Sequence, residues 1–264
     1  MEMRADAACR HRSGLTALLA SCRDVLLPRA CAGCGRPDRI LCEVCRGLLD
    51  RRCERPLEGT SLGVCLCCAD YRGAVRRAML EWKDHGDEEC TRCFASALAG
   101  LMIGDATLGA RPDPYCESPR IVLIPLPSSP SSLRRRGRWH ILSLARLLAV
   151  LLRRRGVDAA VLPLLRLSAG LARSVEASRA DQRARRLSAG VVVVRSELER
   201  LWAIRPRPMV LLVDDIMTTG ATMRGCVSAL RGAGVEVAAG VALASTPKEG
   251  PQRGLSAPTG PSAV

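Results

Sequence analysis

Two adjacent acids, followed by threonines and a glycine, form the stretch of this sequence best suited to chemistry. The segment VLLVDDIMTTGATM (210–223) runs from an apolar strand through Asp214 and Asp215 into a small-residue loop and then a helical pattern. Neighbouring carboxylates repel each other, and the small residues after them bury little apolar surface. A merely structural connection therefore explains the segment poorly. The carboxylates can instead accept hydrogen bonds from the vicinal hydroxyls of a sugar.

The loop that follows the acids is suited to a phosphate. Backbone N–H groups of such a loop, together with the N-terminus of the next helix, favour an anion. The spacing departs from the P-loop and no lysine follows the glycine, which disfavours an ATPase. The segment predicts a ribose-phosphate site with Asp214 and Asp215 as candidate catalytic residues. The predicted binding loop consists of Thr218, Thr219, Gly220, Ala221 and Thr222.

Four of the 14 cysteines have the spacing of a structural zinc site. The segment CAGCGRPDRILCEVC (31–45) contains two C-x-x-C pairs. Each pair can present two thiolates to one cation, and two pairs complete a tetrahedral site of four sulfurs. A disulfide scaffold would need an oxidising compartment, of which the sequence has no other sign. We therefore predict that Zn²⁺ is bound by Cys31, Cys34, Cys42 and Cys45.

An imperfect copy of this module follows it. The copy reads Cys53-x-x-Pro56 and then Cys65-x-x-Cys68, so that a proline stands where the fourth ligand would be. We interpret it as a degraded second zinc ribbon and predict no second metal. A site that uses the three remaining cysteines stays open.

The elements that must position these residues alternate between strands and helices from residue 120 onward. The run IVLIPLP (121–127) is apolar throughout, as expected of a strand buried on both faces of a parallel sheet. A loop rich in serine and arginine follows, and then a helix that ends at Gly156. This order predicts an α/β fold with a doubly wound parallel sheet, which binds ligands outside the carboxyl ends of its strands. The other predicted elements are strands at 160–167, 191–194, 209–215 and 235–245 and a helix at 222–234.

Composition divides the chain into five segments. Residues 72–102 carry apolar residues at helical spacing and predict two helices joined by DHGDE. Proline and glycine mark a linker at 109–120 and a tail at the end of the chain. The predicted segments are an N-terminal helical segment (1–28), a cysteine-rich zinc-ribbon module (29–70), bridging helices (71–110), the main α/β domain (117–245) and a disordered tail (246–264).

The formal net charge of +14 would suit a nucleic-acid partner. Only Lys83 and Lys248 are lysines, however, and aromatic residues make up 2% of the chain, so no stacking platforms accompany the arginine blocks. Direct nucleic-acid binding is therefore kept as an alternative. No apolar run reaches the roughly 18 residues of a membrane span, and the N-terminus lacks the apolar centre of a secretory signal. We expect a cytoplasmic protein.

Taken together, these motifs resemble the ComF family. VLLVDDIMTTGAT is similar to the phosphoribosyl pyrophosphate (PRPP) motif of type I phosphoribosyltransferases. The C-x-x-C module, YRGAVRRAMLEWKDHG and PLPSSPSSLRRRGRWHILSLAR extend the resemblance from Leu15 to Ala244. The resemblance implies a type I phosphoribosyltransferase-like sheet with a small N-terminal zinc ribbon and an association with DNA uptake in natural competence. It also implies that Mg²⁺ accompanies PRPP and that Arg134, Arg135 and Arg138 lie near its pyrophosphate.

The chain departs from the family at residues 136–140, where members often read RGFNQ, and at Leu187, where asparagine is common. His140 is a candidate base, but we favour its interpretation as a loop or helix-cap histidine. Two functions follow from the resemblance. One is an enzyme that transfers the phosphoribosyl group of PRPP to a nucleophile and releases pyrophosphate. The other is a non-catalytic sensor of PRPP or a nucleotide that binds single-stranded DNA, or a DNA-uptake or helicase protein.

Overall fold

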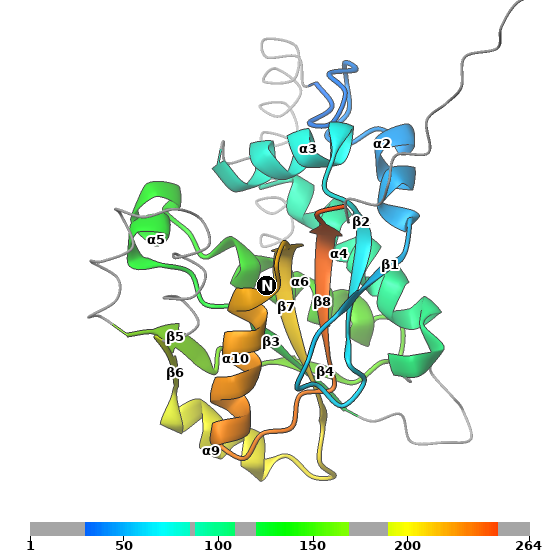
Figure 1. The fold of residues 1–264 in the computed structure, drawn as a ribbon. Coiled ribbons are helices and arrows are strands. Elements are labelled where there is room, and N and C mark those ends of the chain that lie inside the picture. Colours follow the sequence, from blue (N-terminus) through cyan, green and yellow to red (C-terminus); the bar gives the residue numbers. More distant parts are fainter. Residues whose placement is uncertain (1–29, 85–87, 109–119, 169–189, 248–264) are drawn as a thin grey trace, which may run out of the picture.

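The computed structural model describes residues 30–84, 88–108, 120–168 and 190–247 (Figure 1). The predicted N-terminal helical segment, Leu187 and the tail from residue 248 lie outside these ranges. The described elements are α2 (Glu43–Gly47), η1 (Leu48–Asp50), β1 (Cys53–Pro56), β2 (Val64–Asp70), α3 (Gly73–Asp84), α4 (Cys90–Gly104), η2 (Ala106–Leu108), β3 (Ile121–Pro125), α5 (Pro130–Arg136), α6 (His140–Arg153), β4 (Ala159–Val161), β5 (Leu165–Leu167), β6 (Val191–Val193), α9 (Arg195–Ala203), β7 (Met209–Met217), α10 (Ala221–Gly232) and β8 (Ala239–Ser245).

Six strands form one mixed sheet in the order β1-β2-β8-β7-β3-β4. Every neighbouring pair is parallel except β1 and β2, an antiparallel pair at one edge. Strands β3 and β8 are buried along their whole length, as their continuous apolar runs require. An α/β fold with a mostly parallel sheet is thereby confirmed.

Helices cover both faces of this sheet (Figure 1). Successive side chains of a strand point to opposite faces, so Leu211 and Val213 of β7 lie in one core while Val210 and Leu212 lie in the other. Helices α4 and α6 pack in the first core, and α9 and α10 pack in the second. The two helices predicted within residues 72–102 are α3 and α4. Because helices cover both faces of the sheet, a ligand is expected at the loops that follow the carboxyl ends of the strands.

The predicted strand at 160–167 is two short strands in different sheets. β4 pairs in parallel with β3, whereas β5 pairs antiparallel with β6 in a separate two-stranded sheet. Pro163 lies between them, and proline has no N–H with which to continue a ladder. The prediction that residues 191–194 join the parallel sheet is also wrong. These residues form β6, whose Val192 is 40% exposed, so they lack the two-sided burial of a central strand.

Residues 53–70, which we assigned to a degraded second ribbon, contribute two strands to the main sheet. β2 lies beside β8, and Cys53 of β1 is the cross-strand partner of Cys67. Cys65, Cys67 and Cys68 are fully buried. Free cysteine packs as a small hydrophobic residue, so the segment VCLCCAD serves as a buried strand. The cysteines of residues 53–70 therefore belong to the main sheet and not to a second ribbon.

The serine- and arginine-rich segment after β3 contains a short helix, α5, where we expected only a loop. Ser129 caps it by accepting a hydrogen bond from the N–H of Ser132 at 3.1 Å, and Pro130 occupies its first turn. Gly137 ends it with a φ of 66°, in the left-handed region that glycine adopts most easily. The sequence did contain the signals for this helix, namely a serine and a proline at its start and a glycine at its end.

Candidate functional site

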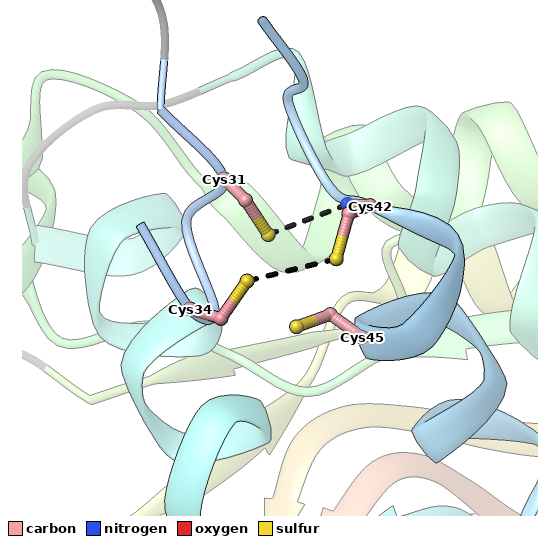
Figure 2. A group of neighbouring side chains, drawn as sticks. All are labelled: Cys31, Cys34, Cys42 and Cys45. Atoms are coloured by element: carbon pink, nitrogen blue, oxygen red, sulfur yellow. Dashed lines mark hydrogen bonds between the residues drawn. The ribbon is translucent and has the colours of Figure 1, made fainter. Parts of the chain in front are cut away.

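The four cysteines predicted to bind zinc converge in space (Figure 2). All four sulfur atoms lie within 4.8 Å of one another. The first pair sits in a tight turn, where the Gly35 N–H donates to the Cys31 carbonyl at 2.8 Å. The second pair begins helix α2, with Cys42 at its N-cap and Cys45 inside it. One turn and one helix start thus aim two thiols each at a common centre.

The cluster has the chemistry of a metal site. Cys34 Sγ and Cys42 Sγ are 3.6 Å apart, close to the roughly 3.8 Å between sulfurs that a tetrahedral site with Zn–S bonds of about 2.3 Å would give. The Cys42 N–H donates to Cys31 Sγ at 3.3 Å. Burial raises the pKa of Cys31, but backbone hydrogen bonds outweigh it and lower the pKa to about 6. The four cysteines could therefore hold a metal such as zinc.

The surroundings of Cys45 favour its protonated thiol. Burial, and then the neighbouring sulfurs, raise the pKa of its thiol above the usual range. Four thiolates cannot share so small a space without a cation, and a bound metal takes the place of their protons.

Gly33 fits a close contact between the cluster and helix α3. A Cβ at this position would lie 2.8 Å from Cys45 Sγ and 3.2 Å from the Ala74 carbonyl oxygen, so no side chain fits. Arg77 donates through Nε to the Gly33 carbonyl at 2.7 Å. The cluster is therefore fastened directly to the first half of α3.

We expect Gly33→Ala to weaken metal binding by about 10- to 100-fold, because overpacking costs about 1–3 kcal/mol. Zinc affinity measured by competition with a chelator tests this. Gly47→Ala is the matched control, since its φ of −61° is helical and an added Cβ meets nothing within 4 Å. Equal zinc affinity in the two variants would contradict the expected crowding.

The second candidate site is a cavity of about 490 Å³ at the carboxyl end of β7. Asp214 and Asp215 both line it, although adjacent strand residues point to opposite faces. Asp215 is 6% exposed, and its Oδ2 is held by His140 Nε2 at 3.0 Å and by Lys83 Nζ. Asp214 Oδ1 accepts a hydrogen bond from the Asp215 N–H at 2.8 Å. Two of these partners, Lys83 and His140, come from α3 and α6.

The surroundings shift the pKa values of the two acids in opposite directions. Burial, and then repulsion by Asp215, raise the pKa of Asp214 well above its usual value. Burial also raises the pKa of Asp215, but the hydrogen bond from His140 and the charge of Lys83 outweigh it, so the pKa is lowered. Burial lowers the pKa of His140 despite the neighbouring carboxylate. Near neutral pH the cavity thus holds an ionised Asp215, a neutral imidazole and an Asp214 that retains a proton easily.

The predicted phosphate loop forms the short connection between the end of β7 at Met217 and the start of α10 at Ala221. Gly220 has a φ of 74°, and a Cβ there would lie 2.5 Å from the Met217 side chain. Thr219 Oγ1 accepts a hydrogen bond from the Ala221 N–H at 3.4 Å. Of the predicted loop, Thr222 is the residue that lines the cavity; Thr218 and Thr219 are exposed beside it.

The three arginines expected near a pyrophosphate lie in different places. Arg135 lines the cavity and is 3.4 Å from Asp84 Oδ1, whereas Arg134 is not among the lining residues. Arg138 points to the Trp82 carbonyl oxygen and to Glu88 Oε1, the latter at 3.2 Å. The structure thus brings one of the three to the cavity.

Sequence reasoning missed several residues of this cavity. Arg136 lines it and pairs with Asp84 Oδ1 at 3.1 Å. His140, interpreted as a helix-cap residue, does begin α6 but is buried against Asp215. Lys83 had a usable signal, being one of two lysines in a chain whose other cationic side chains are arginine. The remaining polar lining consists of Ser128, Ser129, Ser131 and Ser132.

No protein-family model matches the chain, and a search of curated proteins found no match. Within the described ranges, no helix has the length and hydropathy needed to cross a membrane.

Proposed function

We propose that this protein is a ComF-like member of the phosphoribosyltransferase family that binds PRPP or a related ribose phosphate in the cavity at the end of β7. One observation carries the proposal: Asp214, Asp215 and Thr222 line a single cavity with serines and arginines of the segment after β3. A sugar ligand needs the carboxylates, and its phosphates need the hydroxyl, guanidinium and backbone N–H donors.

In the proposed complex, Asp214 and Asp215 accept hydrogen bonds from the vicinal hydroxyls of ribose. The 5′-phosphate lies at the start of α10, where Gly220 permits close approach of the backbone and the helix N-terminus favours an anion. Arg135 and Arg136, which line the same cavity, would contact the pyrophosphate. Electrostatic stabilisation of that leaving group and positioning of the acceptor would supply most of the rate enhancement.

Mg²⁺ belongs to the same proposal. It is usually bound by one or two carboxylates together with substrate phosphates. Among the described residues, Asp214 forms no ion pair, so it is the acid of the pair that is available to such an ion, which would displace its proton. The four-cysteine cluster would hold its zinc structurally, outside this cavity.

A non-catalytic sensor is the second candidate, and one observation favours it. Arg135 and Arg136 are paired with Asp84, and Arg138 with Glu88. Cations neutralised in this way stabilise a departing pyrophosphate less than free ones would. In the sensor, the same cavity binds PRPP or a nucleotide without turnover, and DNA or a DNA-uptake protein is the partner suggested by the family resemblance.

PRPP with Mg²⁺ is expected to raise the melting temperature by about 5–10 °C at a concentration about 100 times its Kd. Thermal-shift measurements with the full chain test this. Free ribose and inorganic pyrophosphate are the controls, since each carries only part of the proposed ligand. A melting temperature unchanged by PRPP would defeat the proposal.

Turnover separates the enzyme from the sensor. The protein is incubated with labelled PRPP and a pool of bases and amines, and pyrophosphate release is compared with that of an Asp214→Asn, Asp215→Asn variant. Release above the variant's level favours catalysis, and binding without release favours the sensor.

A further inference from the structure

We infer that Lys83 is a positioning residue of the ribose-phosphate site, which it enters from helix α3 to hold the Asp215 side chain in a fixed orientation. This inference rests on the proposed function of the cavity. It adds a residue that lies outside the strand–loop–helix segment on which that proposal was built.

The contact geometry supports a positioning role. Lys83 Nζ and His140 Nε2 both bind Oδ2 of Asp215, and neither uses Oδ1. A carboxylate held through one oxygen by two donors has a fixed orientation, and its other oxygen can be turned to a ligand hydroxyl. The Lys83 side chain is 22% exposed and also lines the cavity. It thus lies within reach of both Asp215 and the ligand space.

The end of α3 is attached to the cavity walls on each side of Lys83. Asp84 pairs with Arg135 and Arg136 of α5. The Trp82 ring lies edge-on to the His140 ring, with centroids 5.1 Å apart, and its carbonyl accepts from Arg138. A lysine present only for solubility needs no such support, whereas one that must hold a charge in place does.

The charges around Asp215 explain what Lys83 contributes. Asp214 of β7 repels Asp215, His140 of α6 donates to it, and Arg136 of α5 acts on His140. Lys83 lowers the pKa of both acids. Without it, both carboxylates take up protons at higher pH, and the pKa of His140 rises because the repelling ammonium is gone. His140 can replace only part of the lost charge.

The test compares wild type, Lys83→Met, Lys83→Arg and Arg76→Met in the full chain. Arg76→Met is the control, because it removes one positive charge from an exposed position of the same helix. The probes are PRPP with Mg²⁺ and ribose 5-phosphate alone, with affinity measured by calorimetry between pH 5 and 8. The melting temperature of each unliganded variant shows whether it is folded.

We expect Lys83→Met to weaken binding of both probes by about 10- to 100-fold and to shift the acid limb of the binding profile to higher pH. Lys83→Arg should recover most of the affinity and restore the acid limb, and Arg76→Met should match wild type. If Lys83→Met does not fold, the Lys83→Arg profile decides: an arginine that fails to keep the wild-type acid limb overturns the inference. Wild-type affinity and an unshifted limb in folded Lys83→Met overturn it too, while leaving the proposed function intact. A wild-type protein that binds neither probe overturns both.

Discussion

Asp215→Asn is expected to lower the free energy of unfolding by about 3 kcal/mol, the cost of breaking a buried ion pair, whereas Asp214→Asn should leave it unchanged or raise it. The two acids are neighbours in sequence, yet their surroundings differ. Asp215 is the shared partner of Lys83 and His140, and asparagine would leave the ammonium without a counter-charge.

Asp214 is the opposite case, because burial and repulsion by Asp215 already favour its protonated form. Asparagine has nearly the same shape as a protonated aspartate, and its carbonyl oxygen can still accept from the Asp215 N–H. The variant also removes the repulsion that arises whenever Asp214 ionises beside Asp215. Loss of a sugar ligand's affinity should nevertheless follow, since Asp214 can release its proton to become a carboxylate when the ligand and its Mg²⁺ bind, whereas an amide cannot.

Chemical denaturation at pH 7 measures the stability difference, with ligand absent. The pH dependence of each acid's contribution to the free energy of unfolding provides a second check. The pKa of Asp215 is lowered in the folded state, so its contribution is present above its unfolded value of 3.8 and is lost as the pH falls below that value. The pKa of Asp214 is raised, so its contribution is present below 3.8 and is lost as the pH rises through the folded pKa. Equal destabilisation by both asparagine variants would refute the proposed division of charge.

Cys45→Ser is expected to remove the metal and to lower the melting temperature by about 10 °C. This shift corresponds to a loss of about 3 kcal/mol in the free energy of unfolding, at about 3 °C for each kcal/mol in a chain of this size. The serine keeps the shape of the side chain but does not supply a thiolate ligand. Since the cluster is fastened to α3 through Gly33 and Arg77, its loss should reach beyond the metal loops. Metal analysis of wild type should find about one zinc per chain, and of the variant about none.

Cys53→Ser is the matched control for this substitution. Cys53 lies in β1, where its sulfur contacts the Ser245 hydroxyl at 3.4 Å and the Ala69 carbonyl. The four-cysteine group at 31–45 is the metal-binding arrangement found among the described residues, and Cys53 is not in it. The control should keep one zinc. A fall in zinc content in Cys53→Ser would mean that the degraded ribbon does bind metal.

Local patterns predicted the parts of the protein whose cause is local. The two C-x-x-C pairs bring two sulfurs each to one side of a turn or helix start, and the structure confirms that the four gather. The apolar run at 121–127 predicted a strand buried on both faces, and β3 is one. The roles assigned to Asp214, Asp215 and the loop after them stay predictions that the experiments above address.

Strand partners could not be predicted in the same way. Residues 53–70 have the cysteine spacing of a ribbon, but their burial is decided by β8, to which β2 pairs from the far end of the chain. Likewise, the valines at 191–193 have high strand propensity whichever sheet they join. Strand pairing depends on which other strand the folded chain brings alongside, and no local sequence pattern encodes that choice.

By itself, the sequence determined the alternating α/β order, the four-sulfur cluster and the placement of two acids near the end of a buried strand that leads into a helix. Each of these follows from side-chain period, ligand spacing or turn chemistry over a short stretch of chain. The tertiary structure alone decided that Lys83 and His140 meet Asp215, that Arg136 reaches the cavity and Arg138 does not, and that the pKa values of Asp214 and Asp215 are shifted in opposite directions. These depend on burial and on Coulomb interactions between residues distant in sequence, which exist only once the helices have packed on the sheet.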